Sequence, residues 1–286
     1  MLSGRIDIHK RPGMTSHDVV HQVRKKLNVK RVGHSGTLDP LAEGVLSIYI
    51  GQATKFIDLL KNSYKIYDVS FEFGKSSDTF DIMGTVVDIP YPEIDLGEFE
   101  TVVRSFQGHQ QQVPPMYSAI KHQGKPLYRY AREGREIKRR PREIEITHLD
   151  VLAWNGREGR IQLRCSSGTY VRSFVVDLAN KFGTDAVMTK LVRLENDFVP
   201  LSDCIAIEQV TPEAIRPPDA FHPGPRVEIS REDYWKLRQG KPFVIQANQT
   251  SDRILLTVDG RFAGTAKAGP EGYTREKIYH DISSSE

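Results

Sequence analysis

The sequence predicts an α+β protein: a large domain with a mixed, mainly antiparallel central sheet and flanking helices, then a small β-rich module. Apolar residues recur with helical spacing in some segments and alternate in others, which indicates both helices and strands. The chain has 286 residues, enough for one large and one small domain at roughly 100–200 residues each. Prolines cluster over 211–225 and predict a linker, and the short apolar runs and glycines beyond it indicate β structure. We therefore expect domains over 1–210 and 226–286.

The first predicted elements are a helix and two strands. Thr15 or Ser16 can cap the start of the helix. Its apolar stripe consists of Val19, Val20, Val23 and Leu27. A strand is expected over 46–50, and the next one has alternating apolar residues at Tyr67, Val69, Phe71 and Phe73. This alternation places Tyr67 on an apolar face, where a buried tyrosine needs a partner for its hydroxyl.

Three further elements follow in the large domain. Apolar residues with helical spacing predict a helix over 99–106. A hairpin is expected next, with strands over 144–151 and 161–165 around a turn at Asn155–Gly156. A helix follows Gly168, with four-residue spacing of Phe174, Leu178 and Phe182.

The basic residues are concentrated, although the net charge is only +3 and the pI is near 8.7. A long segment interrupted by prolines and glycines, over 110–142, holds one run: Lys121, Lys125, Arg129, Arg132, Arg135, Lys138, Arg139, Arg140 and Arg142. A second cluster consists of Arg24, Lys25, Lys26, Lys30 and Arg31. Together with Tyr117, Tyr128 and Tyr130, the run suits a phosphate backbone with bases to stack on. A solvated charged face has the same composition, so both interpretations stay open here.

Several classes of protein are excluded by simpler features. No apolar run approaches the roughly 20 residues needed to cross a bilayer. The N-terminus lacks the apolar region of a signal peptide. Cys165 and Cys204 match neither a zinc motif nor a disulfide framework. We expect a cytoplasmic protein without a structural metal.

The most informative segment is 31–46, with the sequence RVGHSGTLDPLAEGVL. Its glycines permit tight backbone, and Pro40 disfavours helical dihedral angles at Asp39. A carboxylate on such a loop, leading into an apolar strand, can be presented at the edge of a cleft. Most Asp-Pro pairs only begin a turn, and the dipeptide by itself favours that simpler interpretation.

The string GHSGTLDPLAEGVL resembles the catalytic motif of the tRNA pseudouridine-55 synthase family. Other motifs follow in the family's order: HKRPGMTS at 9–16, KIY at 65–67, TFDIMG at 79–84, VPPMYSAIK at 113–121, GTYVRS at 168–173 and LVR at 191–193. Arg11 interrupts the family's spacing in the first of these. The motifs cover about 9–194, and the C-terminal module weakly resembles a PUA-type RNA-binding domain.

The resemblance implies the pseudouridine synthase fold and an isomerase that breaks the glycosidic bond of uridine 55 in the T-loop of tRNA, rotates the base and rejoins it through C5. Asp39 would be the nucleophile, since glycosidases use carboxylates against an electron-poor C1′. Whether Asp39 attacks the sugar, adds to the base or removes a sugar proton stays open. Arg172, in the first turn of a helix, opposes the helix dipole, and the resemblance implies that it pairs with Asp39 and keeps it ionised. Tyr67 would stack on the uracil, and its hydroxyl is a candidate to move the C5 proton.

The remaining implied roles concern substrate binding. Tyr170 and Leu191 would hold the base, and His34 would occupy the space that the uridine vacates when it flips out of the RNA stack. Lys10 would support the active-site loops. The 110–142 segment would clamp RNA, and could fold on binding. No metal or organic cofactor is expected, because the rearrangement is internal to the nucleotide; the expected partner is tRNA, bound by a monomer.

Simpler or different interpretations compete with this one. Without the resemblance, Tyr67 would be a plain core tyrosine and Arg172 an exposed surface arginine. A synthase acting on ribosomal or guided RNA is one rival, and an RNA-binding protein with secondary or lost catalysis is another. A hydrolase built on Ser35 and His34 is disfavoured, since GHSG is not the G-x-S-x-G nucleophile motif.

Overall fold

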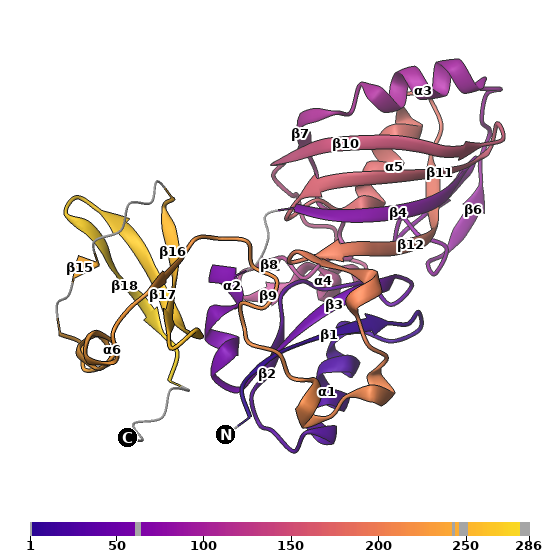
Figure 1. Cartoon of the computed structure of the whole chain (residues 1–286). Helices are drawn as coiled ribbons and strands as arrows, with labels where there is room; N and C mark the ends of the chain where they lie inside the picture. The colour runs from indigo at the N-terminus through magenta and orange to yellow at the C-terminus, as the bar shows by residue number, and fades with distance from the viewer. Residues whose placement is uncertain (1, 61–63, 242–243, 246–250, 281–286) are drawn as a thin grey trace. The chain divides into compact units, whose positions relative to one another are not determined.

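A computed structural model of the chain describes residues 2–60, 64–241, 244–245 and 251–280. The chain forms two compact units: unit 1 is Met1–Pro40, Gly44–Asn62 and Asn196–Glu286, and unit 2 is Leu41–Glu43 and Ser63–Glu195. Both units combine helices with mainly antiparallel sheets, which confirms the predicted α+β class (Figure 1). In the described parts of the chain, no helix is long and apolar enough to cross a membrane.

Unit 1 begins with a small sheet and one helix. β1 (Gly4–Lys10) and β2 (Val32–His34) both pair antiparallel with β3 (Glu43–Ile50). The helix α1 (Ser16–Lys26) is capped by Thr15, whose hydroxyl accepts from the Asp18 N–H while the Asp18 carboxylate accepts from the Thr15 N–H. The predicted helix start is therefore confirmed. Its buried apolar residues are Val19, Val20 and Val23.

Short elements complete the first part of unit 1: η1 (Gly51–Phe56), α2 (Ile57–Leu60), β13 (Val199–Pro200), η2 (Leu201–Asp203), η3 (Ile207–Gln209) and η4 (Pro212–Ala214). The segment that contains η2 to η4 runs alongside β1, because Ile205 forms a β-bridge with Ile8 and Arg216 forms one with Arg5. The predicted linker thus includes one helical turn and a residue paired with β1.

The C-terminal part of unit 1 is a curled five-stranded sheet in the order β14-β16-β17-β18-β15. The strands are β14 (Arg226–Glu228), β15 (Val244–Ile245), β16 (Arg253–Val258), β17 (Arg261–Gly269) and β18 (Gly272–Ile278). This confirms the predicted PUA-like β module. It also contains a helix that the sequence did not predict, α6 (Arg231–Arg238), which buries Tyr234 and Leu237 in the module's core.

Unit 2 is built on a sheet in the order β12-β4-β11-β10-β7. The strands are β4 (Tyr64–Phe73), β7 (Gly108–Gln112), β10 (Arg142–Trp154), β11 (Glu158–Ser166) and β12 (Ala186–Asn196). The last residue of β12, Asn196, already belongs to unit 1. The predicted hairpin is confirmed, since β10 and β11 pair antiparallel up to Trp154 and Gly159. Tyr67 lies among buried apolar residues of β4, as the alternation predicts: Val69, Phe71 and Phe73.

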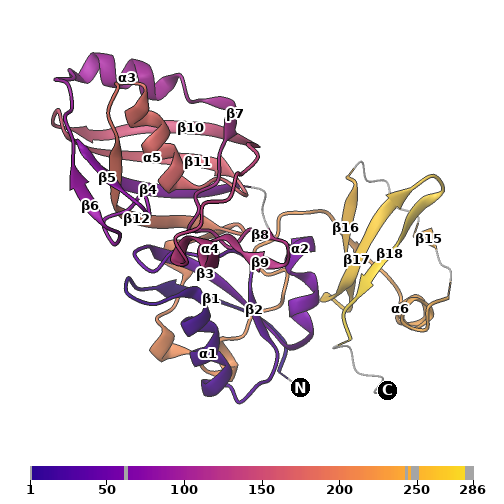
Figure 2. The same ribbon diagram turned by 180° about the vertical axis from the view of Figure 1, so that it is seen from behind.

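One face of this sheet is covered by α3 (Leu96–Arg104) and α5 (Val171–Asn180), as Figure 2 shows for α5. Aromatic side chains fill the space between them. Phe99 of α3 stacks on Trp154 with ring centroids 4.0 Å apart. Phe106 meets Phe174 of α5 edge to face at 5.5 Å. α5 is therefore held against the sheet by a packed apolar layer.

The basic segment between β7 and β10 has structure of its own. It contains β8 (Lys121–His122), β9 (Lys125–Pro126) and α4 (Leu127–Arg132); a second small hairpin in unit 2 consists of β5 (Lys75–Ser77) and β6 (Val86–Asp88). Tyr130 is only 6% exposed, with Lys125 and Arg135 over its ring at 4.6 and 5.1 Å. Cations of the chain thus already lie over the ring of this tyrosine.

Candidate active site

The residues singled out in the sequence divide between the two units. Unit 1 holds Lys10, His34 and Asp39, and unit 2 holds Tyr67, Tyr170, Arg172 and Leu191. Each group is positioned by contacts within its own unit.

Asp39 lies on the loop between β2 and β3, and the backbone on both sides of it is fixed. The hydroxyl of Ser16, which is 2% exposed, accepts from the Leu38 N–H at 2.8 Å and donates to the Leu38 carbonyl at 3.1 Å. The Gly13 N–H donates to the Pro40 carbonyl at 2.8 Å. Because both neighbours of Asp39 are bonded to the segment before α1, the half-buried carboxylate extends from a rigid backbone.

Lys10 stabilises that preceding segment. Its side chain is fully buried, and its ammonium donates to the carbonyls of Arg11 at 3.1 Å and Met14 at 2.7 Å. Gly13 has a φ of +86°, a conformation that side chains disfavour. Arg11, which interrupts the family's spacing, is thus accommodated with its carbonyl facing the lysine. Contact between Lys10 and a substrate stays a prediction.

His34 is the last residue of β2, opposite Ile48 of β3, and is half-buried. The next residue, Ser35, donates its N–H to the Ser47 carbonyl at 3.2 Å. The loop that carries Asp39 therefore leaves the sheet at a fixed point. The role of His34 in the RNA stack stays a prediction.

Arg172 is the second residue of α5 and is 4% exposed, so the alternative of an exposed surface arginine is wrong. Its Nη1 donates to the Thr79 carbonyl and its Nη2 to the Tyr117 carbonyl, both at 2.8 Å. The Asp81 carboxylate lies 3.9 Å from Nε. Two carbonyl dipoles and a carboxylate therefore offset the helix dipole that this cation opposes.

The turn that receives Arg172 is built by the motif at 79–84. Phe80 has a φ of +64°, which is unusual for a residue with a side chain. The Thr79 hydroxyl donates to the Asp81 carboxylate at 2.7 Å and fixes the turn. A Cβ at Gly84 would lie 2.3 Å from a carboxylate oxygen of Asp78 and 2.4 Å from the Thr79 hydroxyl, so a larger residue would displace these side chains. The Thr, Asp and Gly of the motif together shape the acceptors of the guanidinium.

Tyr67 and Leu191 lie on β4 and β12, which are neighbours in the sheet of unit 2. Their exposed fractions are 7% and 5%. Burial of this degree fits an apolar pocket for a planar base and equally fits ordinary core packing. Their contact with uracil therefore stays a prediction.

Tyr170 is the residue before α5, and Gln112 of β7 fixes its backbone. The Gln112 side chain, 3% exposed, accepts from the Tyr170 N–H at 2.8 Å and donates to the Tyr170 carbonyl at 3.0 Å. The Ser173 hydroxyl donates to the Val113 carbonyl at 3.0 Å. The start of α5, and with it Arg172, is thereby attached to the edge strand of the sheet.

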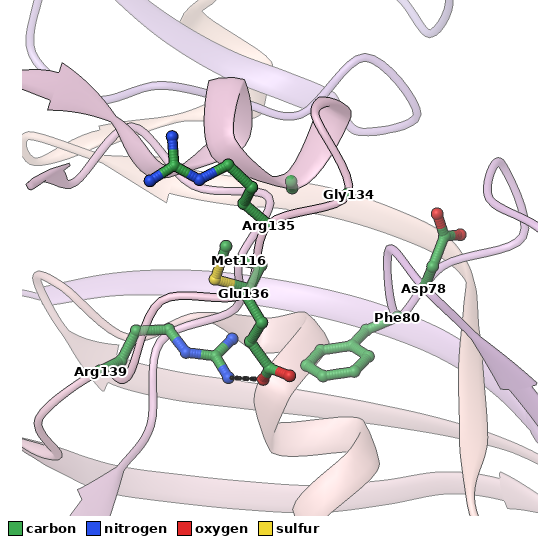
Figure 3. A pocket seen from close by; sticks show the side chains of 8 residues that line it. Asp78, Phe80, Met116, Gly134, Arg135, Glu136 and Arg139 are labelled. Atoms are coloured by element: carbon green, nitrogen blue, oxygen red, sulfur yellow. Dashed lines mark hydrogen bonds and ion pairs between the residues drawn. The ribbon is translucent and has the colours of Figure 1, made fainter.

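A pocket of about 280 Å³ adjoins the same turn (Figure 3). Asp78 and Phe80 flank Thr79, and Met116 precedes Tyr117, so the carbonyl acceptors of Arg172 adjoin its wall. The other lining residues are Ala131, Gly134, Arg135, Glu136 and Arg139, all from the basic segment, and Glu136 pairs with Arg139 at 2.9 Å. The pocket is therefore lined by groups of both signs.

Tyr117 links this pocket to Arg172. Its carbonyl accepts from Arg172, and its hydroxyl donates to the Asp78 carboxylate at 3.3 Å. Burial and the Asp78 carboxylate raise the pKa of Tyr117 above its usual value. The phenol is therefore a neutral hydrogen-bond donor at neutral pH.

Sequence reasoning assigned no role at the candidate site to Ser16, Gln112 or Asp81, although each positions a predicted residue. Ser16 and Asp81 are motif positions, so the motifs contained the signal. Gln112 lies just outside a motif, and its bonds to Tyr170 join residues 58 apart in the chain. Among the residues that the structure describes, no group of three or more His, Cys, Asp or Glu side chains is placed to hold a metal ion.

Unit 1 thus carries a carboxylate on a rigid loop, and unit 2 carries a buried cation with aromatic residues. A carboxylate of this kind can serve as a nucleophile or a base at a sugar or a base. The fold of the chain has a counterpart among solved structures. It is similar to the crystal structure of a Cbf5-Nop10-Gar1 complex, with a TM-score of 0.73 and 22% identity, covering 96% of this chain and 84% of that one. At 22% identity, this likeness shows a shared fold.

Residues 24–171 match the model of the TruB family pseudouridylate synthase N-terminal domain. The chain is 43% identical over 218 residues to the tRNA pseudouridine synthase B of Bacillus pumilus (strain SAFR-032), covering 73% of this chain and 70% of that one. It is 36% identical over 300 residues to the protein of that name from Latilactobacillus sakei subsp. sakei (strain 23K), covering 97% and 98%. A Yersinia pestis (strain Pestoides F) relative is 39% identical, covering 73% of this chain and 65% of its own length. The chain belongs to the TruB family of pseudouridylate synthases, which confirms the predicted family and enzyme class.

Proposed function

We propose that this protein converts uridine 55 in the T-loop of tRNA to pseudouridine. The observation that carries the proposal is the match to a tRNA pseudouridine synthase B along 97% of this chain and 98% of the relative. The proposed residues Asp39, Tyr67 and Arg172 are all present. An RNA-binding protein that had lost catalysis would show substitutions at these positions.

In the proposed mechanism, the uridine flips out of the RNA stack and Asp39 acts at the exposed nucleotide. Cleavage of the glycosidic bond leaves an electron-poor C1′, which a carboxylate can stabilise or attack. The bonds from Ser16 to Leu38 and from Gly13 to Pro40 support this role, because they hold the carboxylate in one geometry before the substrate arrives. Asp39 is required for the reaction in this mechanism whether it attacks the sugar, adds to the base or removes a sugar proton.

Arg172 is the proposed partner of Asp39. A guanidinium presents its N–H donors in a fixed plane that matches the two oxygens of a carboxylate. A cation beside a carboxylate favours the ionised form and orients it. The pair would thus orient the carboxylate toward the nucleotide.

The other residues have proposed roles around the base. Tyr67 stacks on the uracil and its hydroxyl is a candidate to move the C5 proton; Tyr170 and Leu191 enclose the base; and His34 fills the space in the RNA stack. Lys10 supports the active-site loops, because its ammonium binds the carbonyls of Arg11 and Met14.

The proposal extends to RNA binding outside the site. The catalytic domain would span 1–210, with the basic segment 110–142 clamping the T-arm and a linker over 211–225. The module at 226–286 would add an RNA-binding surface. We further propose that the protein acts as a monomer in the cytoplasm, where tRNA is modified.

The test is to incubate the purified protein with unmodified tRNA transcript and map pseudouridine by carbodiimide treatment and primer extension. A single stop at uridine 55 is expected, and it should vanish with Asp39→Asn. Asp88→Asn is the matched control, because the Asp88 side chain is 83% exposed on β6. A transcript with cytidine at position 55 should give no stop.

Other results would replace the proposal. A stop at another uridine, or in ribosomal RNA only, would identify a different substrate. Tight binding of tRNA without any modification would favour an RNA-binding protein, and Asp39→Asn would then behave like wild type.

A further inference from the structure

We infer that Asn196 is a positioning residue for the loop that carries Asp39, an inference that rests on the proposed function only for its effect on catalysis. Asn196 ends β12 and is fully buried in unit 1. It belongs to none of the motifs. Its side chain nevertheless bonds to a residue of the Asp39 loop.

The amide of Asn196 joins two serines. Its Nδ2 donates to the hydroxyl oxygen of Ser35 at 3.1 Å and to that of Ser47 at 3.1 Å. Ser35 is the first residue of the loop after β2, and Ser47 is a fully buried residue of β3. One planar group thus fixes the distance between the beginning of the loop and the strand that follows it.

Ser47 is itself held in place by a buried ion pair. Arg5 donates from Nη2 to the Ser47 hydroxyl at 3.1 Å. The same guanidinium binds the Asp7 carboxylate with two bonds, of 2.6 and 3.1 Å. The side chains of Arg5 and Asp7 are each 1% exposed. Asn196 therefore anchors Ser35 to a rigid polar group in the core, not to a mobile surface.

The loop is consequently fixed at three points. At Ser35 the side chain binds Asn196 and the N–H binds the Ser47 carbonyl. At Leu38 both backbone groups bind Ser16, and at Pro40 the carbonyl binds Gly13. The second and third points fix the neighbours of Asp39. The first point fixes the direction in which the loop leaves the sheet.

Core packing alone does not explain an asparagine at this position. A buried amide is unfavourable unless it is hydrogen-bonded, and an apolar side chain of similar volume would fill the same space. What the amide adds is directionality, because its two N–H hydrogens lie in the amide plane at fixed angles and are donated to two serines. The polar group thus selects one loop conformation.

The experiment compares Asn196→Leu and Ser35→Ala with wild type in single-turnover assays, with release of tritium from C5 of labelled uridine in tRNA as the readout. We expect each variant to lower the rate at saturating enzyme by about 10-fold, since small displacements of a reacting group have effects of this order. The dissociation constant for tRNA should change by less than about 2-fold. Because both residues act through one bond, the double variant should be no slower than the slower single variant.

Two further measurements separate positioning from general destabilisation. Asp219→Asn weakens a different ion pair of unit 1, between the buried Asp219 carboxylate and the exposed Arg226 side chain, and should leave the rate unchanged. Hydrogen exchange at the Ser35 amide should accelerate in Asn196→Leu and Ser35→Ala but not in Asp219→Asn. If Asn196→Leu does not fold, Ser35→Ala still tests the bond, because it removes only the hydroxyl at the loop.

The outcomes distinguish the two proposals. A wild-type protein that releases no tritium refutes the proposed function, and exchange at Ser35 then still tests the anchor. Unchanged exchange, or fully additive effects of the two substitutions, overturns the role of Asn196.

Discussion

The Asp39 loop of unit 1 and the Arg172 turn of unit 2 use the same device to hold a functional residue. In each, one buried side chain binds both the N–H and the carbonyl of a residue one or two positions before the functional residue. Ser16 does so for Leu38, before Asp39, and Gln112 does so for Tyr170, before Arg172.

The two regions differ in how the functional side chain itself is treated. Arg172 is 4% exposed and its guanidinium binds two carbonyls, so its environment also stabilises the fold. Asp39 is half-buried on a loop whose bonds fix the backbone on either side of it. We therefore expect changes near Asp39 to affect mainly catalysis, and changes near Arg172 to affect stability as well.

The largest effect is expected for Arg172→Met. Removal of the buried cation leaves the Asp81 carboxylate and two carbonyls without this donor, so the free energy of unfolding should fall by about 3–5 kcal/mol. Isomerisation should be lost. Urea unfolding followed by circular dichroism measures the first effect and tritium release the second.

Asp39→Asn is the counterpart in the other region. It should lower the rate of isomerisation by at least about 1,000-fold, yet change the unfolding free energy by less than about 1 kcal/mol. Equal losses of stability in the two variants would show that the contrast between the regions is wrong.

A smaller effect is expected for Ser16→Ala. The variant loses both bonds to Leu38, which should lower the unfolding free energy by about 1–3 kcal/mol and the turnover rate by about 10-fold to 100-fold. Thr15→Ala is a matched control, since loss of the helix cap lowers stability by about 0.5–2 kcal/mol without touching the loop. If both variants keep the wild-type rate, the clamp on Leu38 does not contribute to catalysis.

Gln112→Met tests the equivalent clamp in unit 2. We expect a loss of about 1–3 kcal/mol in unfolding free energy, because two buried bonds to Tyr170 disappear. The turnover rate should fall less than in Ser16→Ala, since Arg172 keeps its own contacts. Calorimetry and tritium release measure the pair of effects, and a larger rate loss than in Ser16→Ala would reverse the comparison.

The smallest effect concerns Asp177, farther along α5 from Arg172. Burial raises the pKa of Asp177 to about 6, from about 3.8 when the carboxyl is exposed. Between these values the folded protein keeps a proton that the unfolded chain releases, so wild-type stability should fall as pH rises from 4 to 6 and then level off. Asp177→Asn should be more stable than wild type by about 1 kcal/mol above pH 6, after allowance for its partial exposure, with no gain near pH 4. Urea unfolding of both proteins at pH 4 and above pH 6 measures this difference. An equal gain in unfolding free energy at the two pH values would show that the raised pKa of Asp177 is not its cause.

The sequence predicted elements with a strong local pattern. Alternation over 67–73 and 144–165 identified β4, β10 and β11, and a capping residue identified the start of α1. Helix α6 was missed because it buries only Tyr234 and Leu237, too few residues for a clear apolar stripe.

The sequence was sufficient to predict which residues form the candidate site, but not the hydrogen bonds that position them. Motifs identified Asp39 and Arg172, yet the bonds that position their neighbours join residues 22 and 58 apart in the chain. Such pairs are created by the packing of distant elements, and local spacing carries no information about them. Asn196 illustrates this most clearly, since its bond to Ser35 spans 161 residues.

The chain crosses between the units after Pro40, Glu43, Asn62 and Glu195. A ribosome makes the chain from its N-terminus, so all of unit 2 is synthesised before Asn196 and the rest of unit 1. A nascent chain that ends at Glu195 already carries Asp39 and Arg172 but lacks the asparagine that binds Ser35. The order of synthesis therefore makes the anchoring of the Asp39 loop a late event in the maturation of this enzyme.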